Sequence, residues 1–169
     1  PEILKQVFAA GHTVGSHTWS HAHLDSKKLT EAQMKEEIEK GFSAVKTAIG
    51  TAPAPFFRFP GLGHTQVALG YLASRNISMF SVDVDSNDFK SSGPDQVIQN
   101  VMTKLDKQGK GVILMHDLQK STAQALPTLL RRLKAGGYKV VHMRAKEQLE
   151  TLPEYDAMLV KDQKVPAVA

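Results

Sequence analysis

Patterns typical of helices and of buried strands alternate along this chain of 169 residues. Helical patterns cover six stretches, at residues 1–10, 30–49, 65–75, 94–109, 121–135 and 145–151. Five short segments between them are expected to be strands, at residues 12–16, 56–59, 77–82, 111–115 and 138–143. The fourth of these segments is almost wholly apolar, as is typical of a parallel strand buried on both faces. The alternation predicts an α/β fold with a mainly parallel sheet.

Residues with strong capping preferences mark several of the expected helix ends. Thr30 and Gln33 have the spacing of a capping box at the start of the second helix, and Gly50 follows its last apolar residue. Pro94 suits the first position of the fourth helix. Pro127 either kinks the fifth helix or marks its true start.

The length fits one domain, which we assign to residues 1–151, followed by a polar tail at 152–169 that is expected to be partly disordered. Hydrophobic residues make up 41% of the chain, which is ordinary for a soluble globular domain, and no apolar run is long enough to span a membrane. The formal net charge is +4. The basic residues are scattered and are not interleaved with aromatic residues, which argues against nucleic-acid binding.

Three histidines fall within seven residues, at His17, His21 and His23. His17 and His21 are four residues apart, a spacing that brings both imidazoles to one face of a helical turn. Two imidazoles placed in this way form half of a divalent metal site. The chain has no cysteine, so any further protein ligand must be a histidine or a carboxylate. A surface loop without a metal remains the alternative at this point.

Polar residues follow four of the expected strands. They are the histidine run, Arg58, the acidic loop at 83–88, and His116 with Asp117. In parallel α/β folds the strands deliver such residues to one edge of the sheet, where active sites form. This convergence favours an enzyme. The acidic loop by itself is equally typical of a solvated turn rich in Asp and Asn.

These segments, in this order, resemble the motifs of the polysaccharide deacetylase family, the NodB-homology domain of carbohydrate esterase family four. The sequence HTWSH at 17–21 is similar to the metal-binding motif, and FRFPG at 57–61 to the Arg-x-Pro motif that lines the cleft. DSNDF at 85–89 is similar to Asp-Ser-x-Asp-Trp, and ILMHD at 113–117 to a motif ending in Leu-x-His-Asp. The resemblance extends from residue 1 to about residue 151.

The chain departs from the family pattern in three ways. Phe89 stands in place of the usual Trp, and Gly61 stands where an aromatic residue often follows the Pro. The family's first motif, Thr-Phe-Asp-Asp, is absent. We therefore expect an irregular (β/α) barrel of the NodB type that is incomplete at its N-terminal strands, with this chain as the C-terminal portion. An N-terminal fragment or a second chain is the expected partner that completes the barrel.

The resemblance implies metal-assisted hydrolysis of the N-acetyl group of N-acetylglucosamine in chitin-type or peptidoglycan glycans. His17 and His21 would hold Zn²⁺ or another divalent ion such as Co²⁺ or Ni²⁺. His116 would be the general acid, and Asp85 would orient it. Asp83 and Asp88 remain alternatives to Asp85, because three aspartates share one loop.

The resemblance implies four further roles. Arg58 would pair with the aspartate of the absent motif, and the backbone N–H of Gly61 would help to stabilise the oxyanion. Trp19 and Leu114 would form the pocket for the acetyl methyl group, with core packing as the alternative for Leu114. Phe89 would shape the pocket wall.

Two other functions remain open at this point. One is a non-catalytic carbohydrate-binding module with a vestigial metal site, and the other is a metal-dependent α/β hydrolase that acts on a non-glycan amide. The glycans that the family modifies imply a secreted, periplasmic or cell-envelope location.

Overall fold

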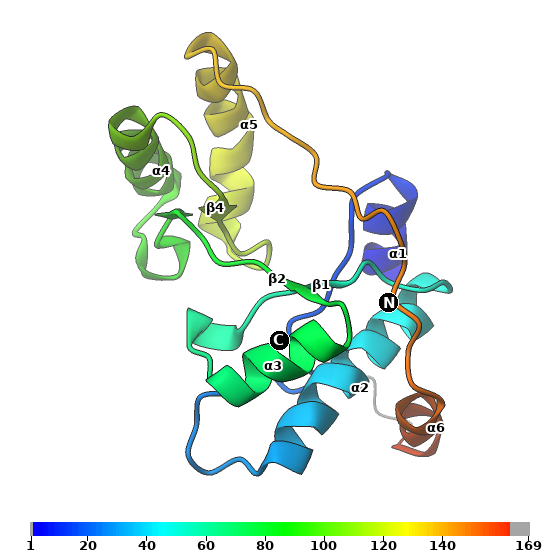
Figure 1. The fold of residues 1–169 in the computed structure, drawn as a ribbon. Helices are drawn as coiled ribbons and strands as arrows, with labels where there is room; N and C mark the ends of the chain where they lie inside the picture. The colour runs from blue at the N-terminus through cyan, green and yellow to red at the C-terminus, as the bar shows by residue number, and fades with distance from the viewer. Residues whose placement is uncertain (1, 163–169) are drawn as a thin grey trace. The chain divides into compact units, whose positions relative to one another are not determined.

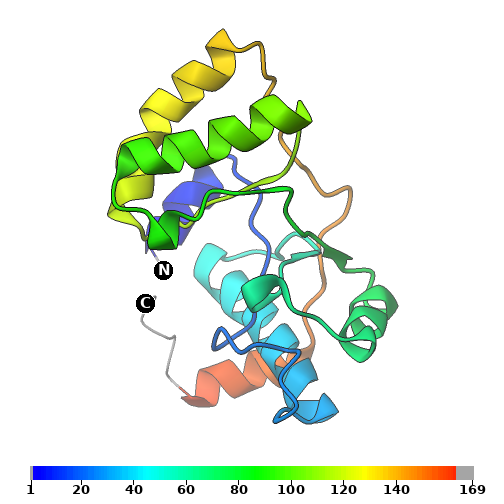
Figure 2. The same cartoon turned by 90° about the vertical axis from the view of Figure 1, so that its left-hand side faces the viewer.

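The computed structural model describes residues 2–162, which divide into two compact units (Figure 1, Figure 2). One unit comprises residues 2–80 and 142–162, and the other comprises residues 81–141. Pro1 of the first predicted helix and residues 163–169 of the predicted tail lie outside the described residues. Each unit contains one pair of parallel strands together with helices, which confirms the α/β class.

The first unit is built around α2, which spans Glu31–Ile49. Thr30 and Gln33 exchange side-chain and backbone hydrogen bonds at its start, so the predicted capping box is confirmed. Gly50 ends the helix with φ of 79°, in the left-handed region that favours glycine. The other elements of this unit are α1 (Glu2–Ala9), β1 (Phe56–Phe57), a 3₁₀ turn (Pro60–Leu62), α3 (Gln66–Ser74), β2 (Ser78–Met79) and α6 (Pro153–Asp162).

Strands β1 and β2 pair in parallel, and a third segment joins them through a single residue. Ser16 bridges Phe57 in parallel; its N–H donates to Phe56 O at 2.8 Å, and its carbonyl accepts the Arg58 N–H at 3.1 Å. The strand predicted at 12–16 is thus reduced to its last residue. Because the bridge is parallel, the residues that follow Ser16 and Phe57 leave the sheet at the same edge.

The core of the first unit forms where the apolar stripe of α2 packs on β1 and α3. Ile38, Phe42, Phe57 and Leu72 are each at most 1% exposed. Burial of an apolar side chain of this size contributes about 1.5–3 kcal/mol. These contacts therefore fix α2 beside the strand that leads to Arg58.

The C-terminal part of this unit differs from the prediction. Residues 145–151 do not form a helix; Leu149 is 5% exposed and donates its N–H to Pro53 O at 2.8 Å. Helix α6 instead occupies part of the predicted tail, where Lys46 Nζ of α2 donates to Asp156 Oδ2 at 2.9 Å and to Thr151 Oγ1 at 2.8 Å. These tertiary contacts outweigh a short and weak helical pattern.

The second unit consists of β3 (Val84–Asp85), a 3₁₀ turn (Asp88–Lys90), α4 (Pro94–Gln108), β4 (Ile113–Leu114) and α5 (Lys120–Ala135). Strands β3 and β4 are parallel. Pro94 begins α4, and Gly109 ends it with φ of 75°, as predicted. Helix α5 continues through Pro127, which excludes that residue as its start. Val84, Val97, Val101 and Leu129 form the centre of the core, each at most 1% exposed.

The strand predicted at 138–143 is not formed in the part of the chain that the structure describes. Val140 and Val141 are 76% and 74% exposed, and no strand among residues 2–162 pairs with this segment. A β-pattern yields a strand only where a second backbone is available to pair with it. The described strands form two separate pairs, so the predicted barrel stays a prediction.

Among residues 2–162, no helix is both long enough and apolar enough to cross a membrane.

Candidate functional site

His17 and His21 lie in a loop, not on the helical turn that their spacing predicted. Residues 17–30 contain no helix, and Thr18 and His21 have left-handed φ angles of 70° and 60°. The imidazole rings of His17 and His21 are still brought together, with centroids 4.9 Å apart in an edge-to-face arrangement. The ring of His23 lies 6.1 Å from that of His21. The prediction that His17 and His21 converge is confirmed, although the backbone achieves it differently.

The backbone of Arg58 orients His17. His17 Nδ1 lies 2.7 Å from Arg58 O, and a carbonyl oxygen can only accept. Nδ1 therefore carries the proton, and in the neutral imidazole Nε2 is the nitrogen with the lone pair. Histidines that ligate metals are commonly held by a carbonyl in this way. The parallel bridge between Ser16 and Phe57 explains the contact, since His17 and Arg58 are the next residues on the two segments.

The two imidazoles fit part of a site for a divalent ion. They are exposed, close together, and one of them is held in the ligating tautomer. Within residues 2–162, no group of three or more His, Cys, Asp or Glu side chains is close enough together to hold a metal ion. The described donor set therefore amounts to two nitrogens, His17 and His21.

The Arg58 side chain lies half-buried, and its Nε donates to Phe80 O at 3.4 Å. Burial lowers the pKa of the Arg58 guanidinium, because desolvation disfavours its charged form. An arginine still remains protonated at neutral pH. The side chain is thus a partly desolvated cation on the residue whose backbone carbonyl orients His17.

Gly61 is required by its surroundings. Its φ of 63° lies in the left-handed region, and a Cβ atom at this position would lie 2.4 Å from Cε1 of His23. The His23 ring therefore packs directly on the turn at 60–62, in space that a larger residue would need. Nothing in the spacing of His23 along the sequence showed this contact. Trp19 is half-buried under Lys40, whose Nζ lies 5.1 Å from the ring centroid.

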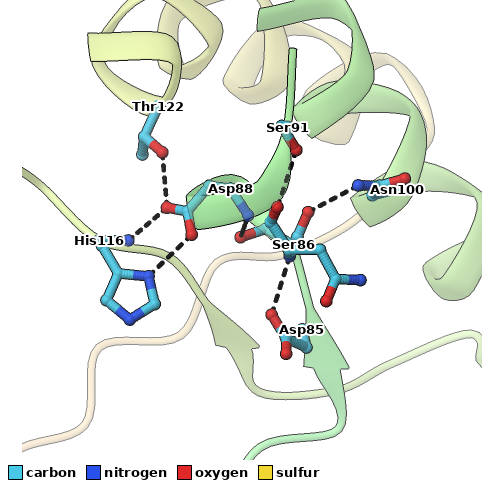
Figure 3. A network of polar contacts seen from close by, with 8 residues as sticks. Asp85, Ser86, Asp88, Ser91, Asn100, His116 and Thr122 are labelled. Atoms are coloured by element: carbon cyan, nitrogen blue, oxygen red, sulfur yellow. Dashed lines mark hydrogen bonds and ion pairs between the residues drawn. The ribbon is translucent and has the colours of Figure 1, made fainter. Parts of the chain in front are cut away.

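A buried carboxylate holds His116 in the second unit (Figure 3). Asp88 is 1% exposed, and its Oδ1 accepts His116 Nδ1–H at 2.7 Å. Its Oδ2 accepts the backbone N–H of His116 and, at 2.6 Å, the hydroxyl of Thr122 from α5. Asp88 thus fixes both the backbone and the ring of His116. His116 Nε2 is left as the nitrogen that can exchange a proton with a bound molecule.

Asp85 does not orient His116, so this prediction is wrong. Its Oδ1 accepts the N–H of Asn87 at 2.8 Å, which closes a local turn. Asn87 has φ of 51° and is followed by buried Asp88, whose carboxylate faces Thr122 and His116 (Figure 3). Asp83 accepts the N–H of Val112 at 2.7 Å and has a structural role. Of the three alternatives, Asp88 is the partner of His116.

The two remaining predicted contact residues lie near this pair. Phe89 is 51% exposed, and its ring packs edge-to-face on His116 with centroids 5.9 Å apart. Leu114 is half-buried in β4, where its carbonyl accepts the N–H of Ser86 at 3.2 Å. Phe89 is therefore available to a ligand that reaches His116, and half-buried Leu114 lies in the strand that leads to His116.

The ionisation of Asp88 is coupled to folding. Burial raises the pKa of this carboxyl, but hydrogen bonds from Thr122 and His116 outweigh it, and the net pKa lies below the ordinary value of 3.8. Because the folded state favours the ionised carboxylate, Asp88 contributes its full stabilisation of the fold above pH 3.8. This stabilisation is lost as the pH falls through the lower pKa of the folded state. We expect the difference in thermal midpoint between wild type and Asp88→Asn to shrink below that pH. A difference that stays constant from neutral pH to about pH 2 would contradict the coupling.

The chain is similar to known proteins in both sequence and fold. The polysaccharide deacetylase family matches residues 1–80. The peptidoglycan-N-acetylglucosamine deacetylase PgdA of Listeria monocytogenes is 30% identical over 141 residues, which cover 83% of this chain and 28% of that protein.

Two solved structures are similar in fold and sequence. A peptidoglycan deacetylase of Bdellovibrio bacteriovorus has a TM-score of 0.78 and 31% identity, covering 87% of this chain and 41% of that one. A CE4 family pseudoenzyme of Bacillus anthracis has a TM-score of 0.73 and 26% identity, covering 82% of this chain and 47% of that one. The chain spans less than half the length of each of these three proteins. With its motifs in order and these similarities in sequence and fold, the chain belongs to the polysaccharide deacetylase family, the NodB-homology group of carbohydrate esterases.

Proposed function

We propose that this chain is part of a metal-dependent hydrolase that removes N-acetyl groups from N-acetylglucosamine-containing glycans of the chitin or peptidoglycan type. The observation that carries the proposal is the pairing of buried Asp88 with His116, in a chain that also holds two histidines in a ligating arrangement. Relatives named as peptidoglycan deacetylases support the same reaction.

His17 and His21 would hold Zn²⁺ or a similar divalent ion such as Co²⁺ or Ni²⁺. A bound ion of this kind supplies Lewis-acid chemistry, activating water and polarising the amide carbonyl. The Arg58 carbonyl keeps His17 in the tautomer that presents Nε2. Two histidines are one protein ligand short of the usual catalytic zinc set, so the proposal requires a third ligand from outside residues 2–162.

His116 donates a proton from Nε2 to the nitrogen of the leaving amine. Asp88 holds Nδ1 and the backbone of the same residue, so the ring keeps one orientation during the transfer. Thr122 in turn fixes Asp88. The breaking bond is the amide C–N bond, and the products are acetate and the free amine of glucosamine.

Four residues are proposed to contact the substrate. Phe89 offers a half-exposed aromatic ring beside His116, and the proposed contact is the packing of a sugar ring on it. The Gly61 N–H and the Trp19 ring lie in the unit that holds the metal ligands, and Leu114 lies in the strand that delivers His116. Their proposed roles are oxyanion stabilisation for Gly61 and contact with the acetyl methyl group for Trp19 and for Leu114.

The complete domain is proposed to be an irregular (β/α) barrel, which the fold similarity to solved deacetylases supports. Val140 and Val141 lie in an exposed segment with a β-pattern, which an N-terminal fragment or a second chain would pair in the barrel. The proposed location is outside the cytoplasm or in the cell envelope, where glycans of this class occur.

A second candidate function is a carbohydrate-binding module without catalysis. The similarity to a CE4 family pseudoenzyme favours it, because this fold also occurs in a protein named as a pseudoenzyme. The Asp88–His116 pair argues for catalysis, since a module that only binds has no need of a buried carboxylate behind an imidazole.

Product analysis separates these functions. The complete gene product is incubated with chitooligosaccharides, with peptidoglycan fragments and with simple N-alkyl acetamides, and the products are identified by mass spectrometry. The proposal predicts free acetate and glucosamine units from the glycans and little reaction with the simple amides. Glycan binding without acetate supports the binding module, and cleavage of simple amides alone supports a non-glycan hydrolase.

A further inference from the structure

One face of α2 contacts the loop that carries His17 and His21. The contacts are made by three consecutive loop residues, Thr18, Trp19 and Ser20. Glu37, Lys40 and Gly41 occupy positions i, i+3 and i+4 of the helix, so they lie on the same face. They contact Ser20, Trp19 and Thr18, respectively. These loop residues stand between His17 and His21.

The contact with Glu37 is the most directional of the three. The Ser20 N–H donates to Glu37 Oε2 at 2.9 Å, and the Ser20 hydroxyl donates to Glu37 Oε1 at 2.7 Å. One carboxylate therefore holds both a backbone and a side-chain donor of the residue immediately before His21. Hydrogen bonds to an ionised acceptor are shorter and stronger than neutral ones.

The other two contacts restrict how far the loop can move. Lys40 Nζ lies 5.1 Å from the Trp19 ring centroid, and it also contacts Glu36 Oε1 at 3.3 Å. A Cβ atom on Gly41 would lie 2.8 Å from the backbone carbon of Thr18 and 2.6 Å from Ser16 Oγ. The loop backbone thus lies directly on the helix, and only glycine permits this approach.

The loop needs such support because of its backbone conformation. Thr18 and His21 have φ angles of 70° and 60°, which residues other than glycine rarely adopt. Residues in this region keep their conformation only where surrounding contacts impose it. The hydrogen bond to Arg58 O orients the His17 ring, whereas His21 directly follows Ser20, so the direction of the His21 ring depends on the backbone before it.

We propose that Glu37 is a positioning residue for the metal-binding histidine pair: through its two hydrogen bonds with Ser20 it sets the backbone that aims His21 toward His17. The inference rests on the proposed function, in which His17 and His21 hold a divalent ion. Glu37 itself contacts neither the ion nor the substrate. Outer partners of metal ligands typically change metal affinity 10–100-fold when removed.

The test is Zn²⁺ binding to the complete gene product, measured by titration calorimetry for wild type, Glu37→Gln, Ser20→Ala and Glu31→Gln. Glu31 is an exposed carboxylate at the start of the same helix, paired with Lys35, and its variant controls for the lost charge. We expect about 10-fold weaker Zn²⁺ binding for Glu37→Gln and a smaller loss for Ser20→Ala, with Glu31→Gln unchanged.

Long-range ¹⁵N spectra of the imidazoles give a second readout. In wild type, Zn²⁺ shifts His17 and His21 with one midpoint, whereas in Glu37→Gln the His21 signals respond at higher Zn²⁺ concentration.

The outcomes separate the inference from the function on which it rests. If wild type binds no Zn²⁺, the proposed metal site fails, and this inference fails with it. If wild type binds Zn²⁺ and both Glu37→Gln and Ser20→Ala bind it equally well, the inference alone is overturned. If Glu37→Gln does not fold, Ser20→Ala decides, because it keeps the carboxylate and removes one hydrogen bond; unchanged affinity and unchanged imidazole shifts in that variant overturn the proposal.

Discussion

Replacing His116 with Asn is expected to lower the rate of acetate release from N-acetylglucosamine oligomers by roughly 10²–10⁴-fold, the usual contribution of a positioned acid or base. Asn can still meet the Asp88 carboxylate with an N–H, but it cannot donate a proton to the leaving amine. We therefore expect kcat to fall and KM to change little. The measurement is steady-state acetate release by the complete gene product.

The matched control is His12→Asn, the same chemical change at an exposed histidine after α1. It should retain the wild-type rate. A His116→Asn variant that keeps the wild-type folding midpoint and more than a tenth of the wild-type kcat would exclude His116 as the general acid.

Replacing His17 or His21 with Ala is expected to weaken Zn²⁺ binding by about 100-fold. A four-ligand zinc site is worth roughly 10–16 kcal/mol, so one ligand accounts for about 3 kcal/mol, or two orders of magnitude. Titration calorimetry or competition with a chelating dye measures the affinity. Both residues are exposed, so the loss should occur without a large change in folding stability.

His23→Ala is the control for this series. The His23 ring lies 6.1 Å from that of His21 and packs on Gly61, and it is not one of the two histidines assigned to the metal. Its replacement should leave Zn²⁺ affinity within a few-fold of wild type. If His23→Ala loses as much affinity as His21→Ala, the ligand assignment is wrong.

The sequence predicted well those features that depend on neighbouring residues. The capping box at Thr30, the glycine ends of α2 and α4, and Pro94 at the start of α4 are all present, because caps are local hydrogen-bond arrangements. The parallel pairing of the strands was also predicted, since it follows from helices that separate successive strands. The convergence of His17 and His21 was predicted from a spacing that the loop satisfies without a helix.

The features that depend on distant residues were not predictable in the same way. Residues 138–143 have a β-pattern but no pairing strand among the described residues, and residues 145–151 are held to the Pro53 connector by Leu149. Thr122 supports Asp88 from 34 positions away, a contact that no motif contains. Backbone and side-chain contacts between residues far apart in the sequence decide these cases.

The choice among the three aspartates was closer to being predictable. Asp85 lies on strand β3, and Val84 and Ser86 on either side of it are buried, so the alternation turns its side chain away from the core. Asn87 tolerates the left-handed conformation that ends the strand and turns the chain inward. Strand alternation and turn chemistry together would have favoured Asp88, although the interaction with His116 required the structure.

The most direct test of a metal-dependent deacetylase is acetate release from N-acetylglucosamine oligomers by the complete gene product, before chelation, after complete metal removal and after Zn²⁺ is restored. The account predicts one bound divalent ion per chain, loss of acetate release on chelation and its recovery with Zn²⁺. Acetate release that continues at the same rate in metal-free protein would contradict the role of His17 and His21. Glycan binding with no acetate release under any of these conditions would replace the enzyme by a binding module.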